Sequence, residues 1–264
     1  MPSDIPVTVV LLTWNSGKTL RRALESVQGC AEILLVDGGS TDDTLTIGHK
    51  FGARVVPQPG GPIADFAMVR NLGLQAATNP WILFLDSDEY LSPEALAGMR
   101  QTAGTTEPAA LLVGRRYVAE DGGLIAHATT YPNERIYFFH RDAVAEWTRP
   151  VHEKVVLKPG IPVFRLPGWT CAPLGTVEDY WRKNERYLRL ERERSSGKGW
   201  GYWTLHRLPR AIRGQIVSIL RLAWIWMIPR TGRRLPLTHE LARWRYRWRL
   251  VRMTMPGRSA KLPQ

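Results

Sequence analysis

The stretch WILFLDSDEY, residues 81–90, runs from five apolar residues directly into Asp86, Asp88 and Glu89. A short apolar run that ends in turn residues is typical of a buried strand. Carboxylates at the end of a buried strand are costly unless they are paired with positive charge or bind a metal. The segment therefore predicts a strand whose carboxyl end holds a positive group.

Short strands and helical patterns alternate along the first hundred residues. Four apolar runs predict strands, at residues 7–13, 32–37, 53–57 and 81–85. Helical periodicity fills the intervals, as in SGKTLRRALESV at 16–27. This alternation predicts an α/β fold with a mainly parallel, Rossmann-like sheet and helices on both faces. Ligands of such sheets bind beyond the carboxyl ends of the strands, near the point where strand order reverses.

Polar side chains follow three of the predicted strands. Asn15, Asp37 and Asp86 each come at a carboxyl end, so three segments are expected to deliver polar groups to one edge of the sheet. In an extended backbone, Asp86 and Asp88 would leave the same side. Carboxylates at such a site bridge Mg²⁺ or Mn²⁺ to substrate phosphates. We favour metal binding by this pair, and the alternative is an acidic turn that caps the next helix.

The segment VDGGSTDDT, residues 36–44, ends the second predicted strand. Its Asp37 is suited to accept a hydrogen bond from the imide of a base or from sugar hydroxyls, and the two glycines permit close approach of a ligand. The alternative is an ordinary joint between a strand and a helix.

Charge is unevenly distributed along the chain. Residues 1–177 hold 15 Lys and Arg against 18 Asp and Glu, whereas residues 178–264 hold 21 against 6 and contain seven of the eleven tryptophans. The chain is therefore expected to consist of a nearly neutral body and a basic, Trp-rich helical extension that seeks an anionic surface.

Two segments of that extension predict contact with a membrane. ELARWRYRWRLVR at 240–252 places Leu241, Trp244, Trp248 and Val251 at helical spacing among five arginines, as in a helix that lies in the membrane interface. QIVSILRLAWIWMI at 215–228 is more apolar but too short to span a bilayer. The alternative is that one or both pack on the rest of the protein. Trp and aliphatic residues at this spacing favour lipid over nucleic acid.

Four motifs occur in a characteristic order: LTWN at 12–15, LVDGGSTDDT at 35–44, RNLGLQAA at 70–77 and LFLDSDE at 83–89. Together they resemble the nucleotide-sugar half of family 2 glycosyltransferases. TYPNERIYFFHRD at 130–142 and RPVHEKVV at 149–156 resemble the branch that includes lipopolysaccharide-core glucosyltransferases. The resemblance covers residues 5–190 and implies a GT-A fold and an inverting transferase that uses a nucleotide diphosphate sugar.

The resemblance also implies roles for individual residues. Those assigned to the nucleotide sugar are Thr13, Asn15, Asp37, Arg70 and Asp86, and those assigned to the metal are Asp86 and Asp88. Glu153 is the candidate general base, which removes the proton of the acceptor hydroxyl. His152 would bind the diphosphate or the metal, or orient Glu153. Only one of two adjacent strand residues faces the site unless the strand is bulged. The alternative is that His152 and Glu153 both lie on an exposed strand edge.

We therefore expect a metal-dependent hexosyltransferase. Its donor would be a nucleotide diphosphate sugar, with UDP as the expected nucleotide, and its acceptor a cell-envelope glycolipid or lipid-linked molecule. The expected location is cytoplasmic, peripheral on the inner face of the plasma (inner) membrane. The expected domains are a catalytic domain at 1–175, with a nucleotide-sugar half at 1–100 and an acceptor half at 101–175, and a helical membrane-associating extension at 176–264.

Two other functions fit parts of the pattern. A sugar nucleotidyltransferase would also carry metal-binding carboxylates, but it needs a Gly-rich loop with Arg and Lys after the first strand, where this chain has TWNSGKTL. A non-catalytic membrane adaptor on a transferase fold would have lost the acids at the strand ends. This chain keeps Asp37, Asp86, Asp88 and Glu153.

Overall fold

The chain divides into a unit built on one large sheet and a unit built mainly of helices. The computed structural model describes residues 5–59, 61, 65–150, 153–195, 197–227 and 231–257. We call the first unit, Met1–Tyr117 with Pro132–Pro173, the sheet unit, and the second, Val118–Tyr131 with Leu174–Gln264, the helical unit. The segment Val118–Tyr131, which lies inside the expected catalytic domain, thus groups with the helices.

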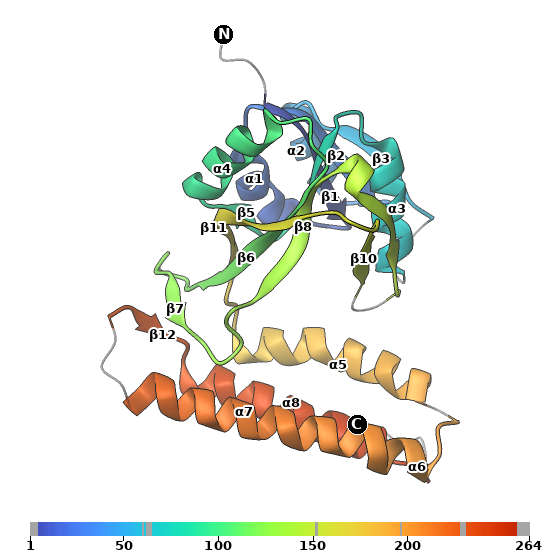
Figure 1. The fold of residues 1–264 in the computed structure, drawn as a ribbon, viewed down its shortest axis with the longest axis vertical. Coiled ribbons are helices and arrows are strands. Elements are labelled where there is room, and N and C mark those ends of the chain that lie inside the picture. Colours follow the sequence, from blue (N-terminus) through green and yellow to red (C-terminus); the bar gives the residue numbers. More distant parts are fainter. Residues whose placement is uncertain are drawn as a thin grey trace. The chain divides into compact units, whose positions relative to one another are not determined.

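The sheet has eight strands in the order β3-β2-β1-β4-β8-β6-β11-β5 (Figure 1). Their bounds are β1 Ile5–Thr13, β2 Cys30–Asp37, β3 Arg54–Pro57, β4 Trp81–Asp86, β5 Tyr90–Leu91, β6 Ala110–Val118, β8 Glu134–His140 and β11 Val163–Pro173. The strands β3, β2, β1 and β4 pair in parallel, as the sequence predicts. Strand β8 pairs antiparallel with both β4 and β6, so the irregular region after residue 110 extends the same sheet.

The register of the parallel strands aligns their carboxyl ends. Thr13 of β1 lies opposite Asp37 of β2, and Leu12 of β1 lies opposite Asp86 of β4. The chain runs from β1 outward to β3 and then returns to the other side of β1 as β4, which places the reversal of strand order between β1 and β4. The acidic ends of β2 and β4 therefore flank the place where sheets of this kind bind ligands.

Helices cover both faces of the sheet, as predicted. They are α1 Gly17–Glu25, α2 Thr44–Lys50, α3 Phe66–Ala76 and α4 Pro93–Ala103. A Cβ atom at Gly48 of α2 would overlap Leu35, and one at Gly73 of α3 would crowd Val36. Because consecutive strand residues point to opposite faces, α2 and α3 pack on opposite faces of β2. Both contacts need a residue without a side chain.

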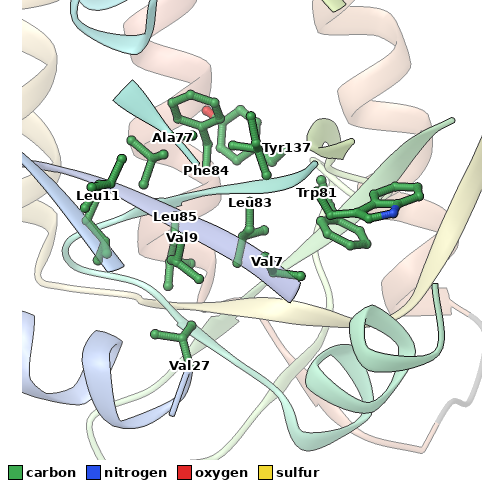
Figure 2. Close-up of a cluster of buried hydrophobic side chains, with 14 of the residues drawn as sticks. Val7, Val9, Leu11, Val27, Ala77, Trp81, Leu83, Phe84, Leu85 and Tyr137 are labelled. Carbon is green, nitrogen blue, oxygen red and sulfur yellow. The ribbon is translucent and has the colours of Figure 1, made fainter. Parts of the chain in front are cut away.

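The core of the sheet unit determines where the strands end. Val9 and Leu11 of β1 and Leu83 and Leu85 of β4 are completely buried among the side chains of Figure 2. Burying one such side chain stabilises the fold by roughly 1.5–3 kcal/mol. The next residue of β4, Asp86, is 30% exposed. The apolar packing therefore stops at the first carboxylate.

A separate hairpin of β9, Val144–Thr148, and β10, Lys154–Leu157, follows the large sheet in sequence. Asn71 of α3 holds it, because its side chain accepts from the backbone N–H of Trp147 at 2.8 Å and donates to the carbonyl of the same residue at 2.9 Å. This attachment brings Glu153, one residue before β10, toward α3.

The helical unit contains α5 Val177–Ser195, α6 Trp200–Tyr202, α7 Leu208–Met227 and α8 Leu237–Met253, with a π-helical turn at Trp203–Arg207. Strand β7, Ile125–His127, pairs with β12, Arg233–Arg234. Helix α5 begins with a capping box, in which Thr176 and Asp179 each accept a backbone N–H of the other at 3.1 Å. Of the two predicted membrane segments, residues 215–227 lie in α7 and residues 240–252 in α8, and Ile228 lies outside the described residues. No helix in the described part of the chain has the length and apolar character needed to cross a bilayer.

Candidate active site

Three carboxylates gather where β4 ends. One oxygen from each of Asp86, Asp88 and Glu89 lies within 4.8 Å of the other two. The backbone here is a turn, closed by a 2.9 Å bond from the N–H of Glu89 to the carbonyl of Asp86. The extended conformation expected for Asp86 to Asp88 is therefore wrong. A turn, rather than an extended backbone, brings the acids together, and it adds Glu89 to the pair that the sequence predicts.

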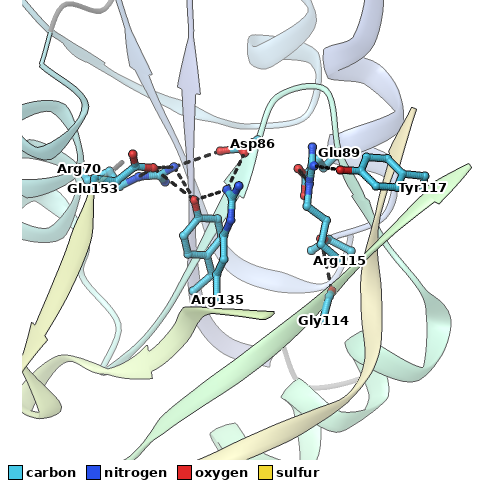
Figure 3. Close-up of polar contacts among 10 residues, drawn as sticks. Arg70, Asp86, Glu89, Gly114, Arg115, Tyr117, Arg135 and Glu153 are labelled. Carbon is cyan, nitrogen blue, oxygen red and sulfur yellow. Dashed lines mark hydrogen bonds and ion pairs between the residues drawn. The ribbon is translucent and has the colours of Figure 1, made fainter. Parts of the chain in front are cut away.

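A buried arginine joins this acidic turn to Glu153. The guanidinium of Arg70 donates to Glu153 Oε1 from Nε at 3.1 Å and from Nη2 at 2.9 Å. The same Nη2 lies 3.1 Å from Asp86 Oδ1 and 3.0 Å from the hydroxyl of Tyr137 (Figure 3). Only 2% of the Arg70 side chain is exposed. Its position supports a role through Asp86 and Glu153 more than direct contact with a nucleotide.

Aromatic rings surround the Arg70 guanidinium. Its Cζ atom lies 5.5 Å from the ring centre of Phe84, 4.7 Å from that of Tyr137 and 5.1 Å from that of Trp147. Among the described residues, Nη1 of Arg70 has no hydrogen-bond partner. A cation over ring faces is attracted by their negative quadrupole, which offsets part of the cost of burial. The rings therefore fix the guanidinium in place.

Two further arginines face the acidic turn. Nε of Arg115 on β6 contacts Oε1 of Glu89, which is 2% exposed. Arg135 on β8 donates from Nη1 to the Tyr137 hydroxyl at 2.8 Å and lies 3.8 Å from Asp86 Oδ2 (Figure 3). The Arg135 side chain is 42% exposed, so it can reach a ligand from this position.

The charges around the turn act on its acids in opposite directions. Burial alone would raise the pKa of Asp86, but Arg70 and then Arg135 outweigh burial and hold the pKa below its usual value. For Glu89, burial and the charge of Asp86 raise the pKa above its usual value, although Arg115 opposes them. Asp86 is therefore the better ligand for a cation at neutral pH, and Glu89 is mainly the partner of Arg115.

Glu153 receives all its described bonds on one oxygen. Besides Arg70, the hydroxyl of Tyr137 donates to Oε1 at 3.3 Å. Among the described residues, Oε2 accepts no hydrogen bond, and the carboxylate is partly exposed. This geometry leaves one oxygen for a substrate hydroxyl. The other candidate in this segment, His152, lies outside the described residues.

Asp37 organises the loop that follows β2. Its Oδ1 accepts from the hydroxyls of Thr13 at 2.8 Å and Ser40 at 2.6 Å, and its Oδ2 accepts from the N–H groups of Gly39 and Ser40, each at 2.8 Å. An ionised carboxylate offers about four acceptor positions, and these bonds engage them. Asp37 and Thr13 are both buried. Contact of either side chain with the nucleoside stays a prediction.

Asn15 links the loops after β1 and β2. Its side-chain oxygen accepts from the N–H of Thr41 at 2.8 Å, and its own N–H donates to the Ser40 hydroxyl at 2.8 Å. Asn15 has a φ of 50°, a left-handed conformation that Asn tolerates better than most residues. One residue later, the hydroxyl of Ser16 lies 3.0 Å from that of Ser87. The loops after β1, β2 and β4 thus form one connected edge.

The site contains residues that the sequence motifs did not reveal. Arg115 and Trp147 are part of it, although no motif of the sequence analysis includes them. Tyr137 is also part of it and lies within the 130–142 motif, but nothing in that motif distinguished it from its neighbours. Glu89 directly follows the Asp-x-Asp pair, but only the turn brings it to the group.

The donor atoms suit a hard divalent cation. Asp86 and Asp88 offer carboxylate oxygens, which Mg²⁺ and Mn²⁺ prefer, and an oxygen of Glu89, the partner of Arg115, lies beside them. The set contains neither sulfur nor imidazole, the ligands that favour zinc or copper. The fold and the site together define an α/β protein with a polar ligand site at the carboxyl ends of its parallel strands.

The chain belongs to glycosyl transferase family 2, whose profile matches residues 8–153. A TPR repeat-containing protein of Synechococcus elongatus is 28% identical over 204 residues, 74% of this chain and 47% of that protein. A PGL/p-HBAD biosynthesis glycosyltransferase of Mycobacterium bovis is 34% identical over 116 residues, 40% of this chain and 45% of the relative. The chain thus matches less than half the length of each of these two curated relatives.

Two solved structures have a similar arrangement. TarS 1–349 of S. aureus, solved with UDP-GlcNAc, has a TM-score of 0.46 at 17% identity and covers 94% of this chain and 90% of its own. Glucosyl-3-phosphoglycerate synthase of Mycobacterium tuberculosis, solved with Mn²⁺, UDP and glucosyl-3-phosphoglycerate, has a TM-score of 0.44 at 20% identity, covering 66% and 74%.

Proposed function

We propose that the protein is an inverting, metal-dependent hexosyltransferase that takes its sugar from a nucleotide diphosphate, UDP in particular. One observation carries this proposal. Oxygens of Asp86, at the predicted metal site, and of Glu153, the predicted base, both bond to Nη2 of Arg70. A donor whose phosphates lie at Asp86 would thus have its sugar near the carboxylate that activates the acceptor. Family membership supports the class of reaction.

The balance of charge supports a metal-bridged diphosphate. Apart from the pair of Glu89 and Arg115, three carboxylates, of Asp86, Asp88 and Glu153, face the guanidinium groups of Arg70 and Arg135, so the site is slightly anionic before a ligand binds. A diphosphate in such a site would be repelled unless a cation accompanied it. When bound at Asp86 and Asp88, Mg²⁺ or Mn²⁺ would offset the charge that gathers on the leaving diphosphate.

Inversion requires a single in-line displacement at C1 of the sugar. Glu153 takes the proton of the acceptor hydroxyl through Oε2 while the acceptor oxygen bonds to C1, and the bond between C1 and the diphosphate oxygen breaks, leaving its electron pair on the diphosphate. Arg70 holds Glu153 by Oε1 throughout. A positioned base of this kind contributes about 10²–10⁴-fold in rate. Arg135, partly exposed beside Asp86, would contact the diphosphate.

The helical unit supports an acceptor that resides at a membrane. Residues 178–264 carry most of the positive charge of the chain. Each Lys or Arg near an anionic leaflet contributes about 1 kcal/mol, so part of this charge is enough to hold the protein there. The acceptor would be a glycolipid or lipid-linked molecule of the kind found in lipopolysaccharide synthesis, as the sequence resemblance implies. The basic, Trp-rich extension would hold the protein on the cytoplasmic face of the membrane.

Donor turnover by a matched pair of variants tests the reaction. UDP-hexoses are incubated with Mn²⁺ and membrane lipid extract, and UDP release is measured. We expect Glu153→Gln to lower kcat by at least 100-fold while the KM for the donor changes little. The control, Glu146→Gln, alters an exposed glutamate of β9 and should keep wild-type turnover. Equal kcat for Glu153→Gln and wild type would exclude Glu153 as the base.

A further inference from the structure

Helix α7 has its polar side facing inward and its apolar side exposed. Gln215, 4% exposed, donates to the carbonyl of Trp244 on α8 at 3.0 Å. Arg247 of α8 donates to the carbonyl of Gly214 at 2.7 Å and also contacts the Ser218 hydroxyl. Hydrogen bonds rather than apolar packing therefore join these parts of α7 and α8.

The opposite side of α7 is a broad, mainly apolar surface that is interrupted by the exposed Arg213. Its exposed large hydrophobic residues are Ile212, Ile216, Val217, Ile219, Leu220, Trp224, Trp226 and Met227. Leu220 is 63% exposed and Met227 79%. At 100° per residue, these side chains cover about half the circumference of the helix. A surface of this size marks contact with a membrane or a partner more often than with water.

A cavity opens beside this surface, between α7 and α8. It has a volume of about 200 Å³ and is lined mainly by carbon atoms of Ile219, Leu222, Leu241 and Trp244. Ile219 and Leu241 are themselves exposed, so the cavity is continuous with the apolar surface of α7. Its volume and apolar lining suit part of a hydrocarbon chain.

Cationic groups line the same cavity. Arg243 and Arg247 contribute to its wall together with Glu240. Glu240 is already engaged, because its two oxygens accept from the N–H and the hydroxyl of Thr129 at 2.8 and 2.5 Å. Arg243 also donates to the Thr130 hydroxyl at 3.3 Å, and Arg247 to the Gly214 carbonyl at 2.7 Å. The two arginines bring positive charge to the wall of the cavity, which complements an anionic group attached to an apolar chain.

We propose that this cavity binds part of one chain of an anionic membrane lipid, with Arg243 and Arg247 at its phosphate, while the exposed side of α7 inserts into the same leaflet. The lipid is chosen over a protein partner because the cavity joins an apolar surface and arginines in a segment with a large excess of positive charge. Helix α7 carries the larger exposed apolar surface, whereas α8, on which Val251 is buried but Leu241 and Trp244 are exposed, supplies the arginines. This lipid site rests on the proposed membrane association but not on the transfer reaction.

Titration of the full chain with dodecyl phosphate, below its critical micelle concentration, tests the site by calorimetry. We expect one molecule to bind per chain, and inorganic phosphate at the same concentration to give no comparable heat. Leu222→Trp fills the cavity and should weaken binding at least tenfold. Leu220→Trp, its control, adds the same ring on the exposed side of the same helix and should bind as wild type does.

A pair of charge variants separates a specific site from general attraction. Arg243→Gln should weaken binding of dodecyl phosphate, and of vesicles containing phosphatidylglycerol, about five-fold. Arg245→Gln removes the same charge from an exposed position of α8 outside this cavity and should have a smaller effect. Equal losses for both variants, or full binding by Leu222→Trp, would overturn the proposal. Binding of UDP with Mn²⁺ on the same samples reports on the donor site, so either proposal can fail alone.

Discussion

Arg70 holds Glu153 by two nitrogen atoms, with Nε and Nη2 at 3.1 and 2.9 Å from the same carboxylate oxygen. The guanidinium is buried, whereas Glu153 is partly exposed. The candidate base is therefore held in position by a buried group that is not accessible to a ligand in the site. Any change at Arg70 should affect stability as well as catalysis.

Replacing Arg70 with Met should destabilise the protein strongly. The variant leaves Asp86 and Glu153 without their shared partner, and breaking a buried pair in this way costs about 3–5 kcal/mol. Urea unfolding followed by circular dichroism measures the loss. The matched control is Arg165→Met, because Arg165 pairs with Glu134 at 3.0 Å but is 72% exposed. That variant should lose less than about 1 kcal/mol. A similar decrease in the free energy of unfolding for both variants would show that burial of the Arg70 ion pairs does not stabilise the protein.

Gly73 should not tolerate a methyl group. Ala favours a helix over Gly by about 1 kcal/mol, yet a Cβ here would overlap Val10, which is completely buried. Overpacking of this kind typically costs about 1–3 kcal/mol, so Gly73→Ala should lower the free energy of unfolding. Gly104→Ala is the comparison, because the nearest atom to its Cβ would be an ordinary 3.5 Å away. A Gly73→Ala protein as stable as Gly104→Ala would contradict the packing of α3 on β1.

Glu32 should make the stability depend on pH under acidic conditions. Burial alone would raise its pKa, but hydrogen bonds from Thr8, Arg54 and Thr78 outweigh burial and lower the pKa to about 2. Because the folded pKa is depressed, this stabilisation is present above about pH 4.5 and is lost as the pH falls toward 2. We expect ionised Glu32 to contribute about 1–2 kcal/mol to the free energy of unfolding, since Arg54 is half exposed and screened by water.

Urea unfolding between pH 2.5 and 6 checks the role of Glu32. Glu32→Gln should be less stable than wild type at pH 6 and should approach it as the pH falls. Glu146→Gln, at an exposed position, should keep the wild-type profile. A constant difference between Glu32→Gln and wild type across the whole range would rule out the proposed titration.

The strand ends were predictable because an apolar run is followed directly by an acid there. The run from Trp81 to Leu85 predicts β4, and Asp86 predicts its end. Because the apolar run is buried, Asp86 is the first residue of the strand that is accessible to a ligand. The parallel neighbours β1 to β3 follow from the same pattern. The edge of the sheet that holds Asp37 and Asp86 could therefore be inferred without a structure.

The partners of these acids were not predictable in the same way. Arg115, Arg135 and Tyr137 come from strands that join the sheet antiparallel after residue 110, and their register depends on contacts between distant residues. The resemblance assigned Arg70 to the nucleotide sugar. The motif around Arg70 identifies the residue but does not show that its side chain is buried. Side-chain direction on a helix is decided by packing, as the rings around this guanidinium illustrate.

Binding of UDP in the presence and absence of Mn²⁺, measured by calorimetry, tests the central claim most directly. With Asp86 and Asp88 as metal ligands, Mn²⁺ should tighten UDP binding to the wild type at least tenfold. Asp88→Asn should lose this gain, while Asp142→Asn, at a residue 68% exposed, should retain it. If Asp88→Asn responds to Mn²⁺ as the wild type does, or if the wild type gives no heat with UDP and Mn²⁺, the acidic turn is not a metal-bridged nucleotide site.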